Sequence, residues 1–285
     1  MPKIAGYELY TIESGRFGLD GGAMFGIIPK PMWEKFIPSD ERNRIPMNMR
    51  CLLLIGNNRV ILVDDGLGDK YDAKFAHIYA VDSEMFNLRR SLAKHNITPD
   101  DVTDVVLSHL HFDHAGGSTT RKGENLVPTF PNATYHVQKS HWEWATSKPN
   151  IRERNSFLRE NLVPLADSGQ LRLQDGSGTL FEGIETMIVH GHTPGQQMLK
   201  VSDHSHTLVF TADLLPTLAH VPSIWVMGYD LQPLVTISEK EAFLREAADK
   251  NWKVMYDHDP YHEISDIHWT DKGPTGVNPR PLNEL

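Results

Sequence analysis

The run Ser-His-Leu-His-Phe-Asp-His-Ala-Gly-Gly, residues 108–117, constrains this chain most, because it places four side chains that bind metals within six positions. It follows an apolar, β-branched segment, Val102 to Leu107, which predicts a buried strand. In extended backbone, residues two apart point to the same side. His109 and His111 can therefore converge on one ion.

The next two ligand candidates, Asp113 and His114, would point elsewhere and suit a second, nearby ion. Imidazole and carboxylate ligands together favour zinc, iron or manganese over calcium. A solvated His-rich loop is the alternative interpretation of a lone His-x-His pair. The full His-x-His-x-Asp-His string, followed by two glycines, argues against that alternative.

Further ligand candidates stand at three later points, each at the end of an apolar run that resembles a strand. They are His190 and His192 after residues 184–189, Asp213 after residues 208–211, and Asp257, His258 and Asp259 after residues 254–256. Loops at strand ends are held by a rigid scaffold while facing solvent, which is the usual layout of catalytic sites.

Composition and charge exclude several classes of protein. The 285 residues suffice for a large core, and the net charge of −9 argues against a nucleic-acid partner. No apolar stretch reaches the roughly 18 residues of a membrane span, and Met1 to Tyr7 lacks a signal-peptide core. The single Cys51 fits a reducing compartment, so we expect a cytoplasmic protein with a small-molecule substrate. Arg152-Glu153-Arg154 is predicted to be solvated surface.

Short apolar runs bounded by turn residues predict many strands, with helical patterns between them. The predicted strands cover residues 50–55, 60–63, 102–107, 133–137, 171–173, 184–189, 197–201 and 207–211. The predicted helices cover residues 83–95, 141–146 and 238–250, and a capping box of Ser238 with Glu241 opens the last. This pattern predicts an α/β layered architecture, with sheets covered by helices.

Residues 15–44 do not fit this scheme, because they are rich in Gly, Pro and aromatic residues. A loop of this length is more often functional than idle. We expect one domain, 1–285, in which residues 15–44 cover the pocket or form a dimer arm. A homodimer is therefore one alternative, and a tail packed across the core is another.

The motifs from Asp64 through His258 resemble those of the metallo-β-lactamase superfamily of metallohydrolases. Asp64-Asp65-Gly66 matches the family's Asp-x-Gly, and residues 191–195 match its Gly-His-Thr-Pro-Gly, which favours His192 over His190 as the ligand. The resemblance implies a four-layer αββα sandwich with a dinuclear metal site at one edge of the two sheets. The implied ligands are His109, His111 and His192 on one metal, Asp113, His114 and His258 on the other, and a bridging Asp213, with Asp64 orienting a ligand histidine.

The implied cofactors are two divalent metal ions per chain, zinc in the first place, with iron, manganese or cobalt as alternatives. Two cations that share a water lower its pKa, so a bridging hydroxide would be the nucleophile. A serine or cysteine nucleophile is then unnecessary, in keeping with the absence of a Gly-x-Ser-x-Gly motif. Asp113 or Asp213 would then shuttle a proton.

Within the superfamily, Leu19 to Gly26 and Pro131 to Gln138 resemble the branch of acyl-homoserine lactone lactonases and methyl-parathion-type organophosphate hydrolases. The implied activity is opening of a lactone or ester, with promiscuous phosphotriesterase action. Several lactonases of this branch carry a tyrosine three residues beyond the bridging aspartate, where this chain has Pro216. His220 and Tyr229 are the candidates to contact the substrate in its place.

Three alternatives remain at this point. A glyoxalase-II-like thioesterase shares the seven ligands but normally carries a basic cluster near its carboxy end, where this chain has only Lys272 and Arg280. An iron-dependent redox enzyme on this fold usually loses or replaces a ligand. A metal-stabilised, non-catalytic binding module would have a closed site, often with cysteine.

Overall fold

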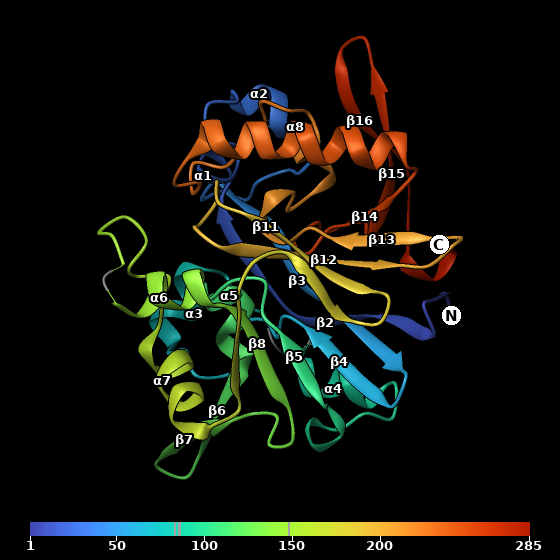
Figure 1. Cartoon of the computed structure of the whole chain (residues 1–285). Coiled ribbons are helices and arrows are strands. Elements are labelled where there is room, and N and C mark those ends of the chain that lie inside the picture. The colour runs from blue at the N-terminus through green and yellow to red at the C-terminus, as the bar shows by residue number, and fades with distance from the viewer. Residues whose placement is uncertain (83, 85–86, 148) are drawn as a thin grey trace. The chain divides into compact units, whose positions relative to one another are not determined.

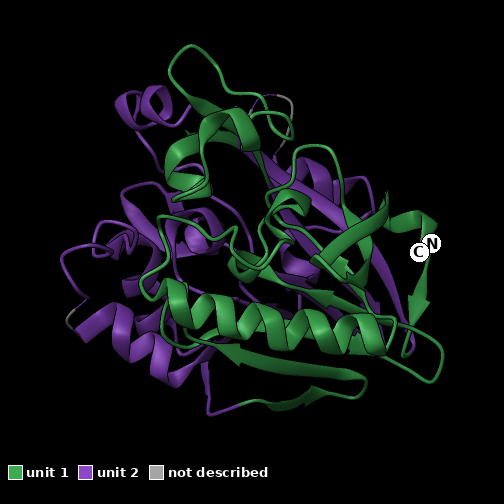
Figure 2. Cartoon of the chain, turned by 90° about the horizontal axis from the view of Figure 1, so that it is seen from above, with its two compact units in different colours: residues 1–5, 17–48, 177–285 green, residues 6–16, 49–176 purple. Residues whose placement is uncertain are grey.

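The structure is a computed structural model that describes residues 1–82, 84, 87–147 and 149–285. It divides into two compact units, which Figure 2 shows in different colours. Unit 1 contains residues 1–5, 17–48 and 177–285, and unit 2 contains residues 6–16 and 49–176. Each unit is therefore assembled from separate stretches of the chain.

Unit 2 contains most of a mixed sheet, in which its strands follow the order β2-β3-β4-β5-β8-β9. The strands are β2 (Tyr7–Asp20), β3 (Arg44–Gly56), β4 (Arg59–Val63), β5 (Asp104–Val106), β8 (Thr134–Gln138) and β9 (Leu171–Gln174). β3 and β4 form an antiparallel hairpin through Asn57 and Asn58, whereas β4, β5, β8 and β9 run parallel. The His-rich motif follows β5 and so lies at the carboxyl end of parallel strands, where ligand sites form in such sheets.

Helices and a small hairpin complete unit 2. They are α3 (Ala73–Ile78), α4 (Leu88–Ala93), α5 (Phe112–Ala115), α6 (Lys139–Ser147), α7 (Arg159–Ser168), the 3-10 turns η1 (Pro99–Asp101) and η2 (Gly116–Ser118), and the hairpin β6 (Thr119–Lys122) with β7 (Asn125–Pro128). Helix α6 contacts β8 and β9, and α7 contacts the hairpin (Figure 1). Leu62, Val105, Phe130, Tyr135 and Leu165 are fully buried in the core of this unit.

Unit 1 is built on a second sheet, with the strand order β10-β11-β12-β13-β14-β15-β16. The strands are β10 (Gly178–Phe181), β11 (Ile184–Val189), β12 (Gln196–Ser202), β13 (Thr207–Phe210), β14 (Lys253–Met255), β15 (Ile264–Thr270) and β16 (Gly273–Arg280), and β1 (Lys3–Ile4) also belongs to this unit. Its helices are α1 (Gly21–Phe25), α2 (Lys30–Trp33), α8 (Pro233–Asp249) and the 3-10 turns η3 (Ala212–Leu214), η4 (Leu218–His220) and η5 (Leu282–Glu284). Helix α8 contacts β15 and β16. Among the described residues, no helix is long and apolar enough to cross a membrane.

All eight predicted strands are present in the two sheets, and α6 lies where a helix was predicted. The prediction for α8 is wrong at its start: the helix begins at Pro233, a residue suited to a first turn. Ser238 lies inside the helix and its hydroxyl donates to the carbonyl of Leu234 (3.2 Å), so it forms no capping box. Of the helix predicted over residues 83–95, the structure has α4, while Ser83, Met85 and Phe86 lie outside the described residues.

Residues 15–44 contain more regular structure than a loop, because β2 reaches Asp20 and α1 and α2 follow. The Asp20 carboxylate accepts a hydrogen bond from the Ala23 amide and so caps α1 (2.8 Å). Phe25 stacks on Trp33, with ring centroids 5.3 Å apart, whereas Ile27 is 86% exposed. The segment therefore has its own buried side and an exposed apolar side. Its role as pocket cover or dimer arm stays a prediction.

Candidate metal centre

In unit 2, the His-rich motif forms the loop after β5 and the short helix α5. Its four ligand candidates are all buried: His109, His111, Asp113 and His114. Imidazole and carboxylate groups buried this deeply must be hydrogen-bonded or must bind an ion. Their partners therefore reveal what this part of the chain can hold.

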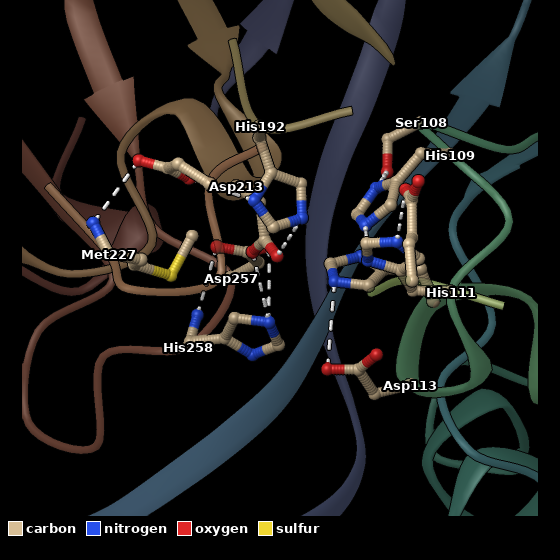
Figure 3. Close-up of polar contacts among 12 residues, drawn as sticks. Ser108, His109, His111, Asp113, His192, Asp213, Met227, Asp257 and His258 are labelled. Carbon is tan, nitrogen blue, oxygen red and sulfur yellow. Dashed lines mark hydrogen bonds and ion pairs between the residues drawn. The ribbon is translucent and has the colours of Figure 1, made fainter. Parts of the chain in front are cut away.

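Two ring nitrogens face each other in this motif: Nε2 of His109 lies 3.0 Å from Nδ1 of His111 (Figure 3). The Ser108 hydroxyl donates its single proton to Asp64 and therefore accepts from Nδ1–H of His109. Nε2 of His111 donates to Glu153 (2.9 Å). With these protons assigned from the network, the lone pairs of both nitrogens point at each other, and a metal ion held by both would satisfy them.

Asp64 fixes the other side of the motif, as predicted for an orienting carboxylate. It accepts hydrogen bonds from the amide and the hydroxyl of Ser108 (both 2.7 Å) and from Nδ1 of His114 (2.9 Å). Nε2 of His114 lies 3.8 Å from an Asp113 oxygen and is the nitrogen of this ring that could bind a metal. Asp64 has a φ of +57°, an unfavourable conformation for an aspartate and one that accumulates at functional sites.

The two glycines behind the motif are required by a close backbone approach. A Cβ on Gly116 would lie 2.2 Å from the carbonyl oxygen of Leu67, and one on Gly117 would lie 2.2 Å from that of Asp65. The loop after β4, which carries Asp64, can therefore approach the motif only because both side chains are missing.

In unit 1, Asp213 lies between two histidines (Figure 3). Its Oδ2 is 3.1 Å from Nε2 of His192, and its Oδ1 is 3.2 Å from Nε2 of His258. The outer nitrogens are anchored: Nδ1 of His192 to the Asp230 carboxylate (2.9 Å) and Nδ1 of His258 to the carbonyl of Asn48 (2.7 Å). Both Nε2 atoms are thus directed at one carboxylate, which suits a shared ligand set for metal.

The carboxylates around His192 make this place favourable for positive charge. Burial would lower the pKa of this imidazole, but Asp213 and Asp230 outweigh it and raise the pKa to about 10. A divalent cation bound between the same groups would satisfy the same negative potential. The donor set of histidine and aspartate, with no cysteine, suits zinc, iron, manganese or cobalt.

A family model of the metallo-β-lactamase superfamily matches residues 48–258. The chain belongs to the metallo-β-lactamase superfamily. An N-acyl homoserine lactonase of Bacillus cereus is 24% identical over 211 residues, covering 71% of this chain and 73% of the lactonase.

Two solved structures share the metallo-β-lactamase fold of the chain over almost its whole length. A probable metal-dependent hydrolase from Staphylococcus aureus has a TM-score of 0.89 and 28% identity, with all of both chains covered. AidC, a dizinc quorum-quenching lactonase in complex with a product, N-hexanoyl-L-homoserine, has a TM-score of 0.81 and 22% identity, covering 99% of this chain and 97% of AidC. The predicted fold is confirmed, and the chain is a metal-dependent hydrolase.

Two carboxylates that hydrogen-bond to predicted ligand histidines were missed by the sequence analysis. Glu153 is 4% exposed and hydrogen-bonded to His111, so its assignment to solvated surface is wrong. A turn at Asn150, whose side chain accepts from the Glu153 amide, directs this side chain inward between two arginines that remain exposed. Asp230 holds His192. Neither Glu153 nor Asp230 stands in a motif. The only signal in the sequence was that each is a carboxylate near aromatic residues.

The structure shows the hydrogen-bond partners of the two remaining histidine candidates, His190 and His220. His190 is exposed and its Nδ1 accepts from the Gly195 amide (3.2 Å), which agrees with the choice of His192 as ligand. His220 is buried, with Nδ1 accepting from the Thr217 hydroxyl (2.7 Å) and Nε2 donating to the carbonyl of Met24 (2.9 Å). Burial lowers the pKa of His220 to about 3, so the ring is neutral. It anchors the α1 segment to η4.

Proposed function

We propose that this superfamily member is a lactonase that uses two divalent metal ions, zinc in the first place. The proposed ligands are His109, His111, Asp113, His114, His192, Asp213 and His258. The observation that carries the proposal is the Asp213 carboxylate, whose two oxygens each face the Nε2 of one histidine. Asp213 would therefore be a ligand shared by two ions, next to His192 for one and His258 for the other. The lactonase relatives support the substrate class.

Two bound metal ions would supply Lewis acidity and would lower the pKa of water to near neutrality. The residues of the chain have separate tasks. Asp64 and Asp230 keep the His114 and His192 rings in the tautomer that leaves Nε2 as a ligand atom. With the ions bound, Asp113 or Asp213 would hold the proton released by the water and would donate it to the ring oxygen of the opened lactone.

An aromatic cluster beside the His-rich motif supports a substrate with an apolar part. The ring of Phe112, which directly precedes Asp113, lies 5.3 Å from the ring of Phe75 and 5.4 Å from that of Tyr79. Phe112 is buried, whereas Phe75 and Tyr79 are half-buried, and half-buried aromatic rings bind acyl chains or aromatic groups through apolar contact. A phosphotriester with an aromatic leaving group would use the same surface, which is the basis for proposing promiscuous phosphotriesterase activity.

Of the two candidates for contact with the substrate carbonyl, Tyr229 is the better placed, because 41% of its surface is exposed. His220 is buried and uses both nitrogens in hydrogen bonds, so we assign it an anchoring role. A homodimer and a cytoplasmic location stay predictions.

A substrate panel on the purified full chain, with metal content measured on the same sample, tests the proposal. We expect two zinc ions per chain and the highest kcat/KM on N-hexanoyl homoserine lactone, with slower turnover of an aryl ester and a phosphotriester. If S-lactoylglutathione alone is hydrolysed, the protein is a thioesterase. Protein with one ion and no turnover of any substrate would favour a binding module.

A further inference from the structure

We propose that Glu153 is a positioning residue for one metal site, holding His111 in the tautomer and orientation that bind metal, with Trp144 in turn holding Glu153. This inference rests on the proposed function, because it takes His111 as a ligand. None of the motifs that identify the metal ligands includes either residue.

The contacts form a chain of three groups within unit 2. Nε2–H of His111 donates to Oε1 of Glu153 (2.9 Å), and the indole Nε1–H of Trp144 donates to Oε2 (2.7 Å). The side-chain amide of Asn150 also donates a longer hydrogen bond to Oε2 (3.3 Å). Glu153 is 4% exposed, so each oxygen is committed to a fixed donor. The carboxylate therefore has one orientation rather than the several open to a glutamate on the surface.

The consequence for His111 is chemical as well as geometric. A proton held on Nε2 by a carboxylate leaves the lone pair on Nδ1, the atom that faces His109 Nε2 at 3.0 Å. A carboxylate behind a ligand imidazole also raises its basicity and hence its affinity for metal. Phe157 lies against the same ring, with centroids 5.2 Å apart, and limits its rotation.

The support is selective for one site. Glu153 reaches His111, which pairs with His109, whereas Asp64 reaches His114, which follows Asp113. Loss of Glu153 should therefore weaken the ion bound by the His109 and His111 pair and leave the other ion in place. A general loss of stability would not discriminate between the two ions.

The test is competition between the protein and a chelator for Zn²⁺, which yields two dissociation constants for the full chain. For Glu153→Gln we expect one constant to rise by about 10- to 100-fold and the other to stay within about twofold. Glu143→Gln removes the same charge from an exposed position on α6 and should change neither. Trp144→Phe keeps an aromatic ring but removes the donor, and should give a smaller rise in the same constant.

A second readout does not depend on activity. The emission of Trp144 is the difference in indole fluorescence between a protein that has Trp144 and the same protein with Trp144→Phe. In metal-free Glu153→Gln this difference should be shifted from that of the wild type. Two unchanged zinc constants in Glu153→Gln would overturn this inference alone, as would equal loss at both sites. A wild-type protein that binds no zinc would overturn the proposed function as well.

Discussion

The two halves of the proposed ligand set are built in different ways. In unit 2, four ligands come from six consecutive positions, and Asp64 supports two of them, His109 through Ser108 and His114 directly. In unit 1, three ligands come from three separate strand ends, and each histidine has its own anchor. A change at the shared support Asp64 therefore affects several ligands of the compact motif. In the dispersed set, a change at one anchor affects one ligand. Asp213 is the exception, because His192 and His258 meet there.

The largest effect is expected at that meeting point. Asp213→Ala removes the carboxylate that faces both His192 and His258, so we expect loss of zinc and a fall in kcat/KM of about 10³-fold or more. Metal content and lactone turnover measure it. Asp249→Ala, an exposed aspartate at the end of α8, serves as the control. A fully metallated and active Asp213→Ala protein would refute the bridging role.

An intermediate effect on zinc affinity is expected for the residues that hold ligands. It distinguishes a residue that supports two ligands from one that supports a single ligand. Asp64→Asn disturbs both Ser108 and His114, so it should weaken both zinc ions by about 10- to 100-fold each. Among the proposed ligands Asp230 contacts His192, and its other oxygen accepts from the Met227 amide, so Asp230→Asn should weaken one ion to the same degree. Chelator competition gives both constants for each variant. If the two variants behave alike, the contrast between shared and separate anchors is wrong.

The smallest effect is expected for an ion-pair network on β14, β15 and β16, because β14 ends shortly before His258. Asp266 on β15 joins Lys253 of β14 (3.1 Å) and Arg280 of β16 (3.0 Å). Partial burial would raise the pKa of this carboxyl, but hydrogen bonds from Arg280, Asn278 and Lys253 lower it to about 2. A lowered pKa in the folded state gives stability that is present above pH 4 and lost as the pH falls toward 2.

We therefore expect Asp266→Asn to lower the free energy of unfolding by about 1 kcal/mol at pH 7, with the difference from wild type shrinking as the pH falls from 4 toward 2. Urea unfolding at several pH values measures it, and zinc affinity at pH 7 should stay unchanged. A constant difference across this range would mean that the carboxylate charge is not what stabilises these strands.

The sequence predicts the strands that precede the proposed ligands, but of the carboxylates that hydrogen-bond to those ligands it predicts Asp64 and not Glu153 or Asp230. Periodicity and turn residues locate β5, β11 and β13, and ligands at the ends of such strands follow from them. Glu153 could not be found in this way, because its role depends on the turn at Asn150 and on His111, which is 42 positions away. The start of α8 was misjudged because a local Ser-x-x-Glu pattern outweighed Pro233.

The contact between His220 and the carbonyl of Met24 joins positions 196 apart in the chain, and Phe25 stacks on the same imidazole (4.6 Å). During synthesis, unit 2 has all its residues once position 176 has left the ribosome. The α1 segment must wait until η4 emerges, about 200 residues after it was itself made. For that interval Met24 and Phe25 lack their partner His220, so the nascent chain carries an apolar stretch that chaperones can bind.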